Sequence, residues 1–388
     1  MDFHENPRLP EGFRCAARHC GIKASGLDLS LFASDTPAHA AALFTRNHFP
    51  GAPVLVGRER IRGRRLQAVI ANSKISNVAT GEGGVDDARR MGLLTARELG
   101  ISEELVLMSS TGVIGERLPM EKLERGILGL ASELGDDPWP AARGIMTTDT
   151  EPKVLSLEVG GATLTAVGKG AGMIAPNMAT MLVFLFTDAE LPAPRLDELL
   201  RRASRKSFEC LSVDSDTSTS DTVAILANGR IGPVDPEPFG SALDAICLRM
   251  SEWVARDGEG ATKLLRVRVV GAADDPEGRR VARSVVDSPL VKTMVYGGDP
   301  NVGRILMAIG KCVECRIVAD RVEARVQGVP VVVGGVRVPY DEARVRGLLA
   351  EDTIEIDISL GVGEGRGLGI GCDLTEGYIR ENSAYASS

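Results

Sequence analysis

Hydrophobic positions along this chain follow two spacings, and each spacing predicts a type of secondary structure. Apolar residues that recur every three or four positions predict amphipathic helices, and proline or aspartate opens several of these stretches. Such helices are predicted at Val85–Leu99, Pro119–Leu134, Pro194–Phe208, Pro236–Ala255 and Asp341–Leu349. Apolar runs and alternation predict strands at Leu66–Ala71, Glu104–Met108, Val154–Val167, Thr180–Phe186, Val223–Asn228, Lys263–Val270, Arg316–Val326 and Thr353–Leu360.

Helical and strand-like stretches are mixed along the chain without a regular strand-helix-strand alternation. A doubly wound parallel sheet needs that alternation. We therefore expect an α/β fold with mixed and antiparallel sheets layered with helices. A chain of 388 residues is long enough for two or three domains or for one large composite domain.

Two local motifs resemble a cofactor site and a metal site, but the residues around them support neither prediction. Residues Leu360 to Gly371 have a spacing like GxGxxG, but a second predicted strand follows in place of the helix that would hold a pyrophosphate. We expect a hairpin there. Cys312 and Cys315 fall in an alternating segment, which puts the two thiols on opposite faces of a predicted strand. We predict neither a metal site nor an organic cofactor.

Composition and charge narrow the function classes. The formal net charge of -8 argues against a nucleic-acid partner, because phosphate binding is driven by clustered Lys and Arg. No apolar stretch is long enough to span a membrane, and the polar, acidic N-terminus does not resemble a signal peptide. These features predict a cytoplasmic protein without a membrane partner. Seven cysteines spread over a long chain fit reduced thiols.

The most informative chemical feature is an abrupt change at Thr180. Residues Gly168 to Ala179 are rich in glycine and other small residues, whereas the chain from Thr180 onward reads TMLVFLFT, which is typical of a buried strand. Cleavage before Thr180 would free an α-amino group with a pKa of about 7.7 to 8.0, which could deprotonate the adjacent hydroxyl. The structural alternative is that β-branched threonine simply suits the start of a strand.

Residues around this position resemble the self-cleavage motif of the ornithine acetyltransferases (glutamate N-acetyltransferases) of arginine biosynthesis. The matching stretch is Lys169-Gly-Ala-Gly-Met-Ile-Ala-Pro-Asn-Met-Ala-Thr180-Met-Leu. Further stretches that resemble the family follow in order along the chain: Gly12-Phe13-Arg14, Gly21-Ile22-Lys23, Ser110-Thr-Gly-Val-Ile-Gly115, Ile145-Met-Thr-Thr-Asp149, Asp214-Ser-Asp-Thr-Ser-Thr219, Asp221-Thr222, Asp257-Gly-Glu-Gly-Ala-Thr-Lys263, Ser288-Pro-Leu-Val-Lys-Thr293, Asp299-Pro-Asn-Val-Gly-Arg304 and Asn382-Ser-Ala-Tyr. So many ordered matches make chance similarity very improbable.

The resemblance implies a self-cleaving acetyltransferase with the ornithine-acetyltransferase or DmpA-like fold. Scission between Ala179 and Thr180 would give an alpha fragment, 1–179, and a beta fragment, 180–388, which interleave in one composite fold. Two copies of each commonly form a heterotetramer. Thr180 would carry an acetyl group from N-acetylornithine to glutamate, giving ornithine and N-acetylglutamate without a cofactor.

The same resemblance implies roles for further residues. The Thr111 hydroxyl and the Gly112 N–H would form the oxyanion hole, and a tetrahedral intermediate does need such fixed donors. Substrate contacts are implied for Thr147, Lys169, Thr180, Glu259, Asn382 and Ser387. Glu259 would bind the amino end of ornithine, because a cationic amine pairs with a carboxylate. Thr148 stays an alternative to Thr147.

The chain departs from the family pattern at two places, and these leave substrate choice open. Asn72-Ser-Lys-Ile-Ser-Asn77 stands where Asn-Ser-Gly-Asn-Ala-Asn is usual, so Lys74, Ile75 and Ser76 are atypical, and Val302 stands where tryptophan is common. Acetyl-CoA as an additional donor, a hydrolase or another acyltransferase on the same scaffold, and a binding protein that never cleaves all remain alternatives.

Overall fold

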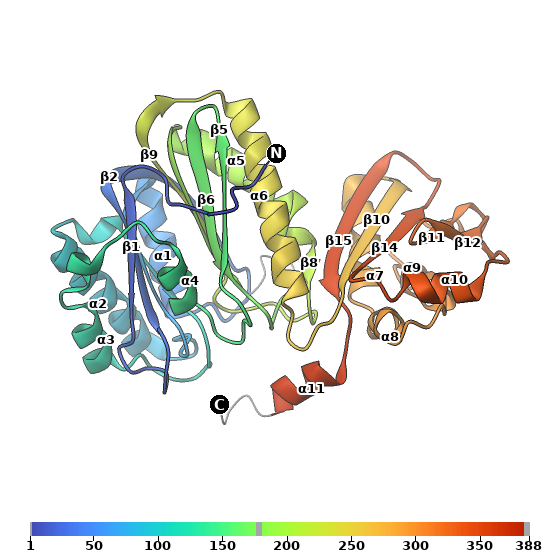
Figure 1. The fold of residues 1–388 in the computed structure, drawn as a ribbon, viewed down its shortest axis with the longest axis horizontal. Helices are drawn as coiled ribbons and strands as arrows, with labels where there is room; N and C mark the ends of the chain where they lie inside the picture. The colour runs from blue at the N-terminus through green and yellow to red at the C-terminus, as the bar shows by residue number, and fades with distance from the viewer. Residues whose placement is uncertain (1, 176–180, 384–388) are drawn as a thin grey trace. The chain divides into compact units, whose positions relative to one another are not determined.

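The computed structural model describes residues 2–175 and 181–383, and the chain divides into two compact units (Figure 1). Unit 1 consists of Met1–Gly170, Asn177–Glu209 and Thr217–Met250, and unit 2 consists of Ala171–Pro176, Cys210–Asp216 and Ser251–Ser388. Unit 1 therefore contains sequence from both sides of the predicted cleavage position. Each unit is built on its own mixed sheet.

The described residues of unit 1 form an eight-stranded sheet with the order β4-β3-β2-β9-β7-β6-β5, in which β1 also pairs with β2. Its strands are β1 (Phe13–Arg18), β2 (Leu29–Phe44), β3 (Arg65–Asn72), β4 (Val106–Ser110), β5 (Lys153–Val159), β6 (Ala162–Lys169), β7 (Leu182–Glu190) and β9 (Thr222–Pro233). The β3–β4 and β7–β9 pairs are parallel, whereas β6 and β7 are antiparallel neighbours. The strands on either side of the predicted cleavage position thus lie side by side.

Helices cover both faces of this sheet. They are α1 (Ala52–Arg60), α2 (Gly81–Leu99), α3 (Met120–Ile127), α4 (Trp139–Gly144) and α5 (Ala193–Lys206), while α6 (Pro236–Arg256) contributes residues to both units. Alternate residues of β3 serve the two faces, as the period of two in a strand requires. Ala68 and Ile70 pack in the core with α1, α2 and α3, and Val69 packs with Phe184 and Phe186 in the opposite core.

The described residues of unit 2 form a seven-stranded sheet with the order β13-β12-β11-β14-β10-β15-β8. Its elements are β8 (Leu211–Ser212), β10 (Leu264–Ala272), α7 (Asp275–Val286), α8 (Pro289–Gly297), α9 (Gly303–Gly310), β11 (Glu323–Val326), β12 (Val329–Val333), β13 (Val336–Arg337), α10 (Glu342–Leu348), β14 (Thr353–Ser359), β15 (Gly365–Cys372) and α11 (Glu376–Ser383). Along β10, Val267 and Val269 are buried in the core with α7, whereas Arg268 pairs with Glu355 at 2.7 Å. One face of this sheet is therefore apolar and the other charged.

Most predicted elements are confirmed. The five predicted helices correspond to α2, α3, α5, α6 and α10, and the apolar run at Val154–Val167 forms the antiparallel pair β5 and β6. The α/β class with mixed sheets is also confirmed. Short 3-10 helices occupy Ile61–Gly63, Glu103–Leu105, Leu130–Glu133, Phe208–Cys210 and Ala319–Arg321.

Three local predictions were wrong. β14 and β15 do not form a hairpin, because β10 lies between them in the sheet. The predicted strand at Arg316–Val326 is a strand only from Glu323, since a 3-10 helix precedes it. Cys312 and Cys315 lie in a turn after α9, where the Cys315 N–H donates to the Cys312 carbonyl at 3.0 Å.

No helix in the described ranges is long and apolar enough to cross a membrane. All seven cysteines fall within these ranges, and none of them forms a disulfide bond with another described residue. Within the same ranges, no group of three His, Cys, Asp or Glu side chains is arranged to hold a metal ion.

Candidate active site

The first cluster of predicted site residues lies where β6 ends. Lys169, the last residue of β6, is buried, and its Nζ donates to the Thr147 Oγ1 at 2.9 Å. Asp149 holds both partners in place, because its Oδ2 accepts the Thr147 N–H at 3.1 Å and its Oδ1 accepts the Gly170 N–H at 2.6 Å. Lys153, at the start of β5, donates from Nζ to the Asp149 Oδ1 at 2.8 Å, and neither side chain is exposed. One buried carboxylate thus fixes Thr147 and the chain beside Lys169.

Positive charge is concentrated in this part of unit 1. Burial alone would raise the pKa of Asp149, but the Lys153 and Lys169 charges outweigh burial and lower that pKa. Burial lowers the pKa of Lys23, and the neighbouring Lys169 and Lys74 charges lower it further. These lysines favour an anionic group, such as a substrate carboxylate or the oxyanion of a tetrahedral intermediate.

Thr111 and Gly112 follow β4 and lie against the loop that leaves β3. A Cβ atom at Gly112 would lie 2.1 Å from the Lys74 carbonyl oxygen, so only glycine permits this close approach. The Val113 N–H donates to the same Lys74 oxygen at 2.8 Å and fixes the contact. No hydrogen bond between described residues engages the Thr111 hydroxyl or the Gly112 N–H. Both groups are therefore available as hydrogen-bond donors, which an oxyanion hole requires.

Lys74, the atypical residue of this loop, adopts a φ of 84°. The left-handed region costs a residue with a side chain about 1–2 kcal/mol, whereas glycine adopts it freely. The loop thus keeps a conformation that suits glycine although lysine occupies the position. The lysine thus stands at the position whose backbone carbonyl contacts Gly112.

The edge of the sheet next to the predicted nucleophile is formed by three adjacent strands. Lys169 of β6 pairs with Leu182 of β7, which in turn pairs with Thr222 of β9. The Thr222 N–H donates to the Met181 carbonyl at 3.1 Å, so the chain is anchored at the residue after Thr180. Thr180 is connected in sequence to the same edge that carries Lys169.

Glu259 and Asn382 lie together in unit 2. The Asn382 Nδ2 of α11 donates to the Glu259 Oε2 at 2.7 Å. The Glu259 N–H donates to the Ala171 carbonyl at 2.9 Å, and a Cβ atom at Gly172 would lie 2.2 Å from the Glu259 carboxyl carbon. The glycine-rich segment before the predicted cleavage position therefore packs directly against this carboxylate.

Asp214 also holds that segment. Its two carboxylate oxygens accept the Met173 N–H at 2.6 Å and the Ile174 N–H at 2.8 Å. Burial raises the pKa of Asp214 to about 6 in spite of these bonds. Burial also raises the pKa of Tyr378, and the negative charges of Asp214 and Glu259 add to that shift. The pKa of Asp214 thus lies closer to physiological pH than the pKa of an ordinary aspartate.

The described site residues fall into two groups. Thr111, Gly112, Thr147 and Lys169 belong to unit 1, and Glu259 and Asn382 belong to unit 2. The remaining three, Ala179, Thr180 and Ser387, lie outside the described residues. The atypical Val302 is 3% exposed and packs in the core of unit 2.

Sequence reasoning missed the residues that support the site. Asp149, Asp214, Asp221 and Lys23 all stand in stretches that resemble the family, but no role was assigned to them. No feature of the sequence indicated a role for Lys153. The hydrogen-bond partners of the three aspartates are mostly remote in sequence, so spacing along the chain does not reveal them.

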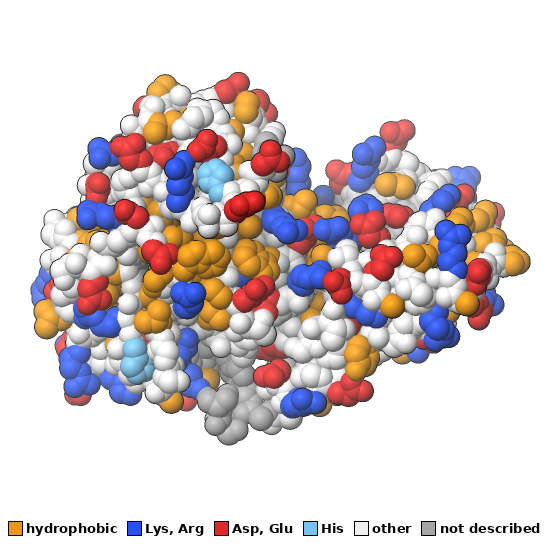
Figure 2. Space-filling model, in the orientation of Figure 1, with side chains coloured by type: hydrophobic (Ala, Val, Ile, Leu, Met, Phe, Trp, Pro, Cys, Tyr) orange, Lys and Arg blue, Asp and Glu red, His pale blue; other side chains and the backbone are white. Residues whose placement is uncertain are grey.

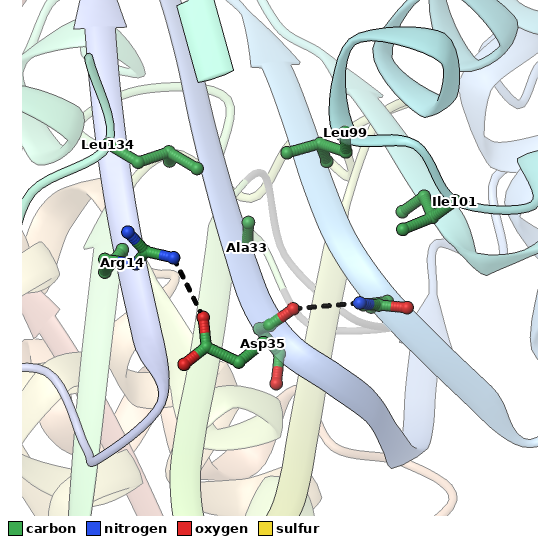
Figure 3. Close-up of a pocket in the computed structure, with 8 residues that line it drawn as sticks. Arg14, Ala33, Asp35, Leu99, Ile101 and Leu134 are labelled. Atoms are coloured by element: carbon green, nitrogen blue, oxygen red, sulfur yellow. Dashed lines mark hydrogen bonds and ion pairs between the residues drawn. The ribbon is translucent and has the colours of Figure 1, made fainter. Parts of the chain in front are cut away.

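A separate cavity of about 190 Å³ lies elsewhere in unit 1 (Figure 3). It is lined by Arg14, Ala33, Ser34, Asp35, Gln67, Leu99, Ile101 and Leu134. Its polar groups bind one another, since Arg14 pairs with Asp35 at 3.0 Å and Gln67 donates to the Ser34 carbonyl at 3.1 Å. No predicted site residue lines it.

On the face shown in Figure 2, basic and acidic side chains are interspersed, unlike the continuous basic surfaces that bind nucleic acid.

Known proteins match this chain over nearly its whole length. The ArgJ family model matches residues 14–387. The chain is 42% identical over 390 residues to the arginine biosynthesis bifunctional protein ArgJ 2 of Clostridium acetobutylicum, covering 98% of each chain. It is 42% identical over 388 residues to the glutamate N-acetyltransferase Oat2 of Streptomyces clavuligerus, covering 98% of this chain and 99% of the relative. The crystal structure of a Bacillus halodurans arginine biosynthesis bifunctional protein matches with a TM-score of 0.50 and 36% identity, covering 52% of this chain and 98% of the solved chain.

These matches identify the chain as an acyltransferase of arginine biosynthesis. The chain belongs to the ArgJ family.

Proposed function

We propose that this chain cleaves itself between Ala179 and Thr180 and then uses Thr180 to transfer an acetyl group from N-acetylornithine to glutamate. The observation that carries the proposal is the pair of unengaged donors at Thr111 and Gly112, in the same unit as the Lys169 cluster at the edge where β7 begins. β7 starts two residues after Thr180, so a rigid strand carries the nucleophile.

Acetyl transfer proceeds in two halves. The α-amino group of Thr180 takes the hydroxyl proton while Oγ attacks the acetyl carbonyl, and Thr111 and Gly112 hold the resulting oxyanion. Ornithine leaves with that proton on its amine, and the acetyl group stays on Oγ as an ester. The amine of glutamate then attacks the ester, and N-acetylglutamate leaves as the Thr180 hydroxyl is restored. This order predicts ping-pong kinetics.

Substrate recognition is supported by charge. The carboxylate of Glu259, held by Asn382, suits the cationic amine of ornithine, and the lysines around Asp149 suit substrate carboxylates. The name of the Streptomyces clavuligerus relative, a glutamate N-acetyltransferase, supports glutamate as the acceptor. Ser387 would complete the substrate contacts near the C-terminus.

Cleavage is tested by intact-protein mass spectrometry of wild type beside Thr180→Ala. We expect fragments 1–179 and 180–388 from wild type and a single intact chain from the variant. The Bacillus halodurans chain, which covers only 52% of this sequence, has the length expected of one such fragment. An intact wild-type chain would contradict the proposal and favour a binding protein that never cleaves.

Transfer is tested by following N-acetylornithine consumption with and without glutamate. We expect rapid consumption only with glutamate, together with parallel double-reciprocal plots. Equal consumption without glutamate would instead indicate a hydrolase.

Acetyl-CoA in place of N-acetylornithine tests the additional donor. An assembly of two alpha and two beta fragments belongs to the proposal, and light scattering of the cleaved protein tests it.

A further inference from the structure

Lys23 extends from a loop of unit 1 that the carboxylate of Asp28 holds in shape. Asp28 is completely buried, and its Oδ1 accepts the Cys20 N–H at 2.6 Å. Its Oδ2 accepts the N–H groups of Gly21, Ile22 and Lys23 at 3.1, 2.7 and 3.0 Å. These four backbone donors fix the path of the loop, because a buried carboxylate that lost them would be poorly solvated. The base of the Lys23 side chain is therefore held in place.

The ammonium group of Lys23 reaches the segment that carries Thr147. Its Nζ donates to the Leu27 carbonyl at 3.0 Å and to the Met146 carbonyl at 2.8 Å. Met146 directly precedes Thr147, whose hydroxyl accepts a hydrogen bond from the Lys169 Nζ at 2.9 Å. The ammonium group of Lys23 thus contacts the residue next to a predicted substrate contact.

The hydrogen bonds to these two carbonyls do not account for the positive charge of Lys23. An ammonium group has three N–H donors, whereas the described residues provide Lys23 with two acceptors and no ion pair. Burial lowers the pKa of Lys23, and the charges of Lys169 and Lys74 lower it further. The attraction of Asp28 and Asp149 only partly offsets these effects. Because a partly buried charge is costly without a partner of opposite sign, an anion from outside the chain would complete this site.

Lys263 shows how a lysine with a purely structural role is bonded. It is half-buried in unit 2, and its Nζ donates to three carbonyls. These belong to Val295 at 2.8 Å, Tyr296 at 3.4 Å and Leu349 at 2.7 Å. Each N–H of the Lys263 ammonium group therefore has an acceptor within the chain, whereas Lys23 keeps one N–H for another group.

We propose that Lys23 binds the α-carboxylate of the substrates through the third N–H of its ammonium group. This inference rests on the proposed function and assigns a residue to one part of substrate recognition. N-acetylornithine and glutamate both carry an α-carboxylate, so the same cation serves both halves of the transfer. Hydrogen bonds between ammonium and carboxylate groups are roughly twice as strong as neutral ones. Asp28 is a positioning residue, because it holds the loop from which Lys23 extends.

The test removes the carboxylate from the substrate and the charge from the protein. N-acetyl-1,4-diaminobutane is N-acetylornithine with hydrogen in place of the carboxylate group. The value of kcat/KM is measured for each donor, with glutamate as the acceptor, in wild type and in Lys23→Met. We expect Lys23→Met to lower kcat/KM for N-acetylornithine about 10–100-fold more than for N-acetyl-1,4-diaminobutane, because only N-acetylornithine loses a hydrogen bond to a charged group.

A purely structural role of Lys23 gives a different result. Loss of the bond to the Met146 carbonyl would then lower kcat/KM for both donors by the same factor, and equal factors overturn the proposal. Equal kcat/KM values for the two donors in wild type overturn it as well. If wild type consumes no N-acetylornithine with glutamate present, the proposed function itself fails.

Two further variants control for folding. Lys23→Gln has no charge but can still donate to both carbonyls, so it provides the same comparison if Lys23→Met does not fold. Lys263→Met is the matched control, in which three carbonyls lose their donor. We expect it to lower the unfolding midpoint in urea and to keep the wild-type preference for N-acetylornithine over N-acetyl-1,4-diaminobutane. An equal loss of that preference in Lys263→Met and in the Lys23 variants would overturn the proposal.

Discussion

The ion pair between Lys153 and Asp149 gives the most quantitative test of the Lys169 cluster. Both side chains are completely buried, and the Lys153 Nζ lies 2.8 Å from the Asp149 Oδ1. Lys153→Met removes the charge and keeps an unbranched apolar chain of similar length. The change leaves Asp149 as a buried carboxylate without its nearest cation.

The expected loss follows from burial. Breaking a buried ion pair by removing one partner costs about 3–5 kcal/mol, because the remaining charge stays out of water. Asp149 would still accept the Thr147 and Gly170 N–H groups and face the Lys169 charge, so we expect a loss near the lower limit, about 3 kcal/mol. A loss of that size is a large fraction of the total stability of most proteins.

Lys206 provides the matched control. Its Nζ lies 2.7 Å from Asp244 Oδ2, which is as close as the buried pair, but the Lys206 side chain is 60% exposed. Exposed ion pairs contribute about 0–1 kcal/mol. We therefore expect Lys206→Met to change the free energy of unfolding by no more than about 1 kcal/mol.

The assay is equilibrium unfolding in urea, in a Thr180→Ala background so that every sample is a single chain. Asp149→Asn and the double variant Lys153→Met/Asp149→Asn complete a double-mutant cycle. We expect the sum of the two single-variant losses in unfolding free energy to exceed the loss of the double variant by about 1–3 kcal/mol. A Lys153→Met loss no larger than that of Lys206→Met, or additive losses in the cycle, would refute the reasoning.

Substitutions at three further positions test other parts of the site. Gly112→Ala should lower kcat about 10²–10³-fold, because the added Cβ would lie 2.1 Å from the Lys74 carbonyl and displace the Gly112 N–H; unchanged steady-state kinetics would contradict this. Lys74→Gly should keep the unfolding free energy or raise it by up to about 1 kcal/mol, whereas Lys74→Val should lower it, because φ is 84°; urea unfolding in which both variants lose stability would contradict this. The pKa of Asp214 is raised from 3.8 to about 6, so the folded state holds this proton more tightly than the unfolded state. Its contribution should therefore lower the free energy of unfolding by about 2–3 kcal/mol as the pH rises from about 4 to about 7, and Asp214→Asn should flatten that fall; an unchanged pH dependence in the variant would refute the assignment.

The local part of the fold was predictable from apolar periodicity. The runs that became β5, β6 and β7 and the amphipathic stretches that became α2 and α5 all carry clear patterns. The order in which the strands pair within each sheet was not predictable in this way. β10 lies between β14 and β15 because of long-range strand pairing, which the glycine-rich connection at Leu360–Gly371 does not encode.

The candidate site was likewise predictable only in part. The resemblance identified Thr111, Gly112, Thr147 and Lys169, and the structure brings Thr147 and Lys169 to within 2.9 Å. It did not identify Asp149 as the residue that holds them. The role of Asp149 depends on burial and on simultaneous hydrogen bonds with Thr147, Lys153 and Gly170, and residue spacing reveals neither the burial nor the bond to the remote Gly170.

The central claim, an acetyl-threonine intermediate at Thr180, is tested most directly by trapping it. Wild-type protein is mixed with N-acetylornithine in the absence of glutamate, quenched in acid and measured by intact-protein mass spectrometry. We expect the fragment that begins at Thr180 to gain the mass of one acetyl group, to lose it when glutamate is added before the quench, and to yield a tandem spectrum that locates the group on Thr180. A fragment that turns over substrate without gaining this mass, or an acetyl group on another residue, would contradict the account.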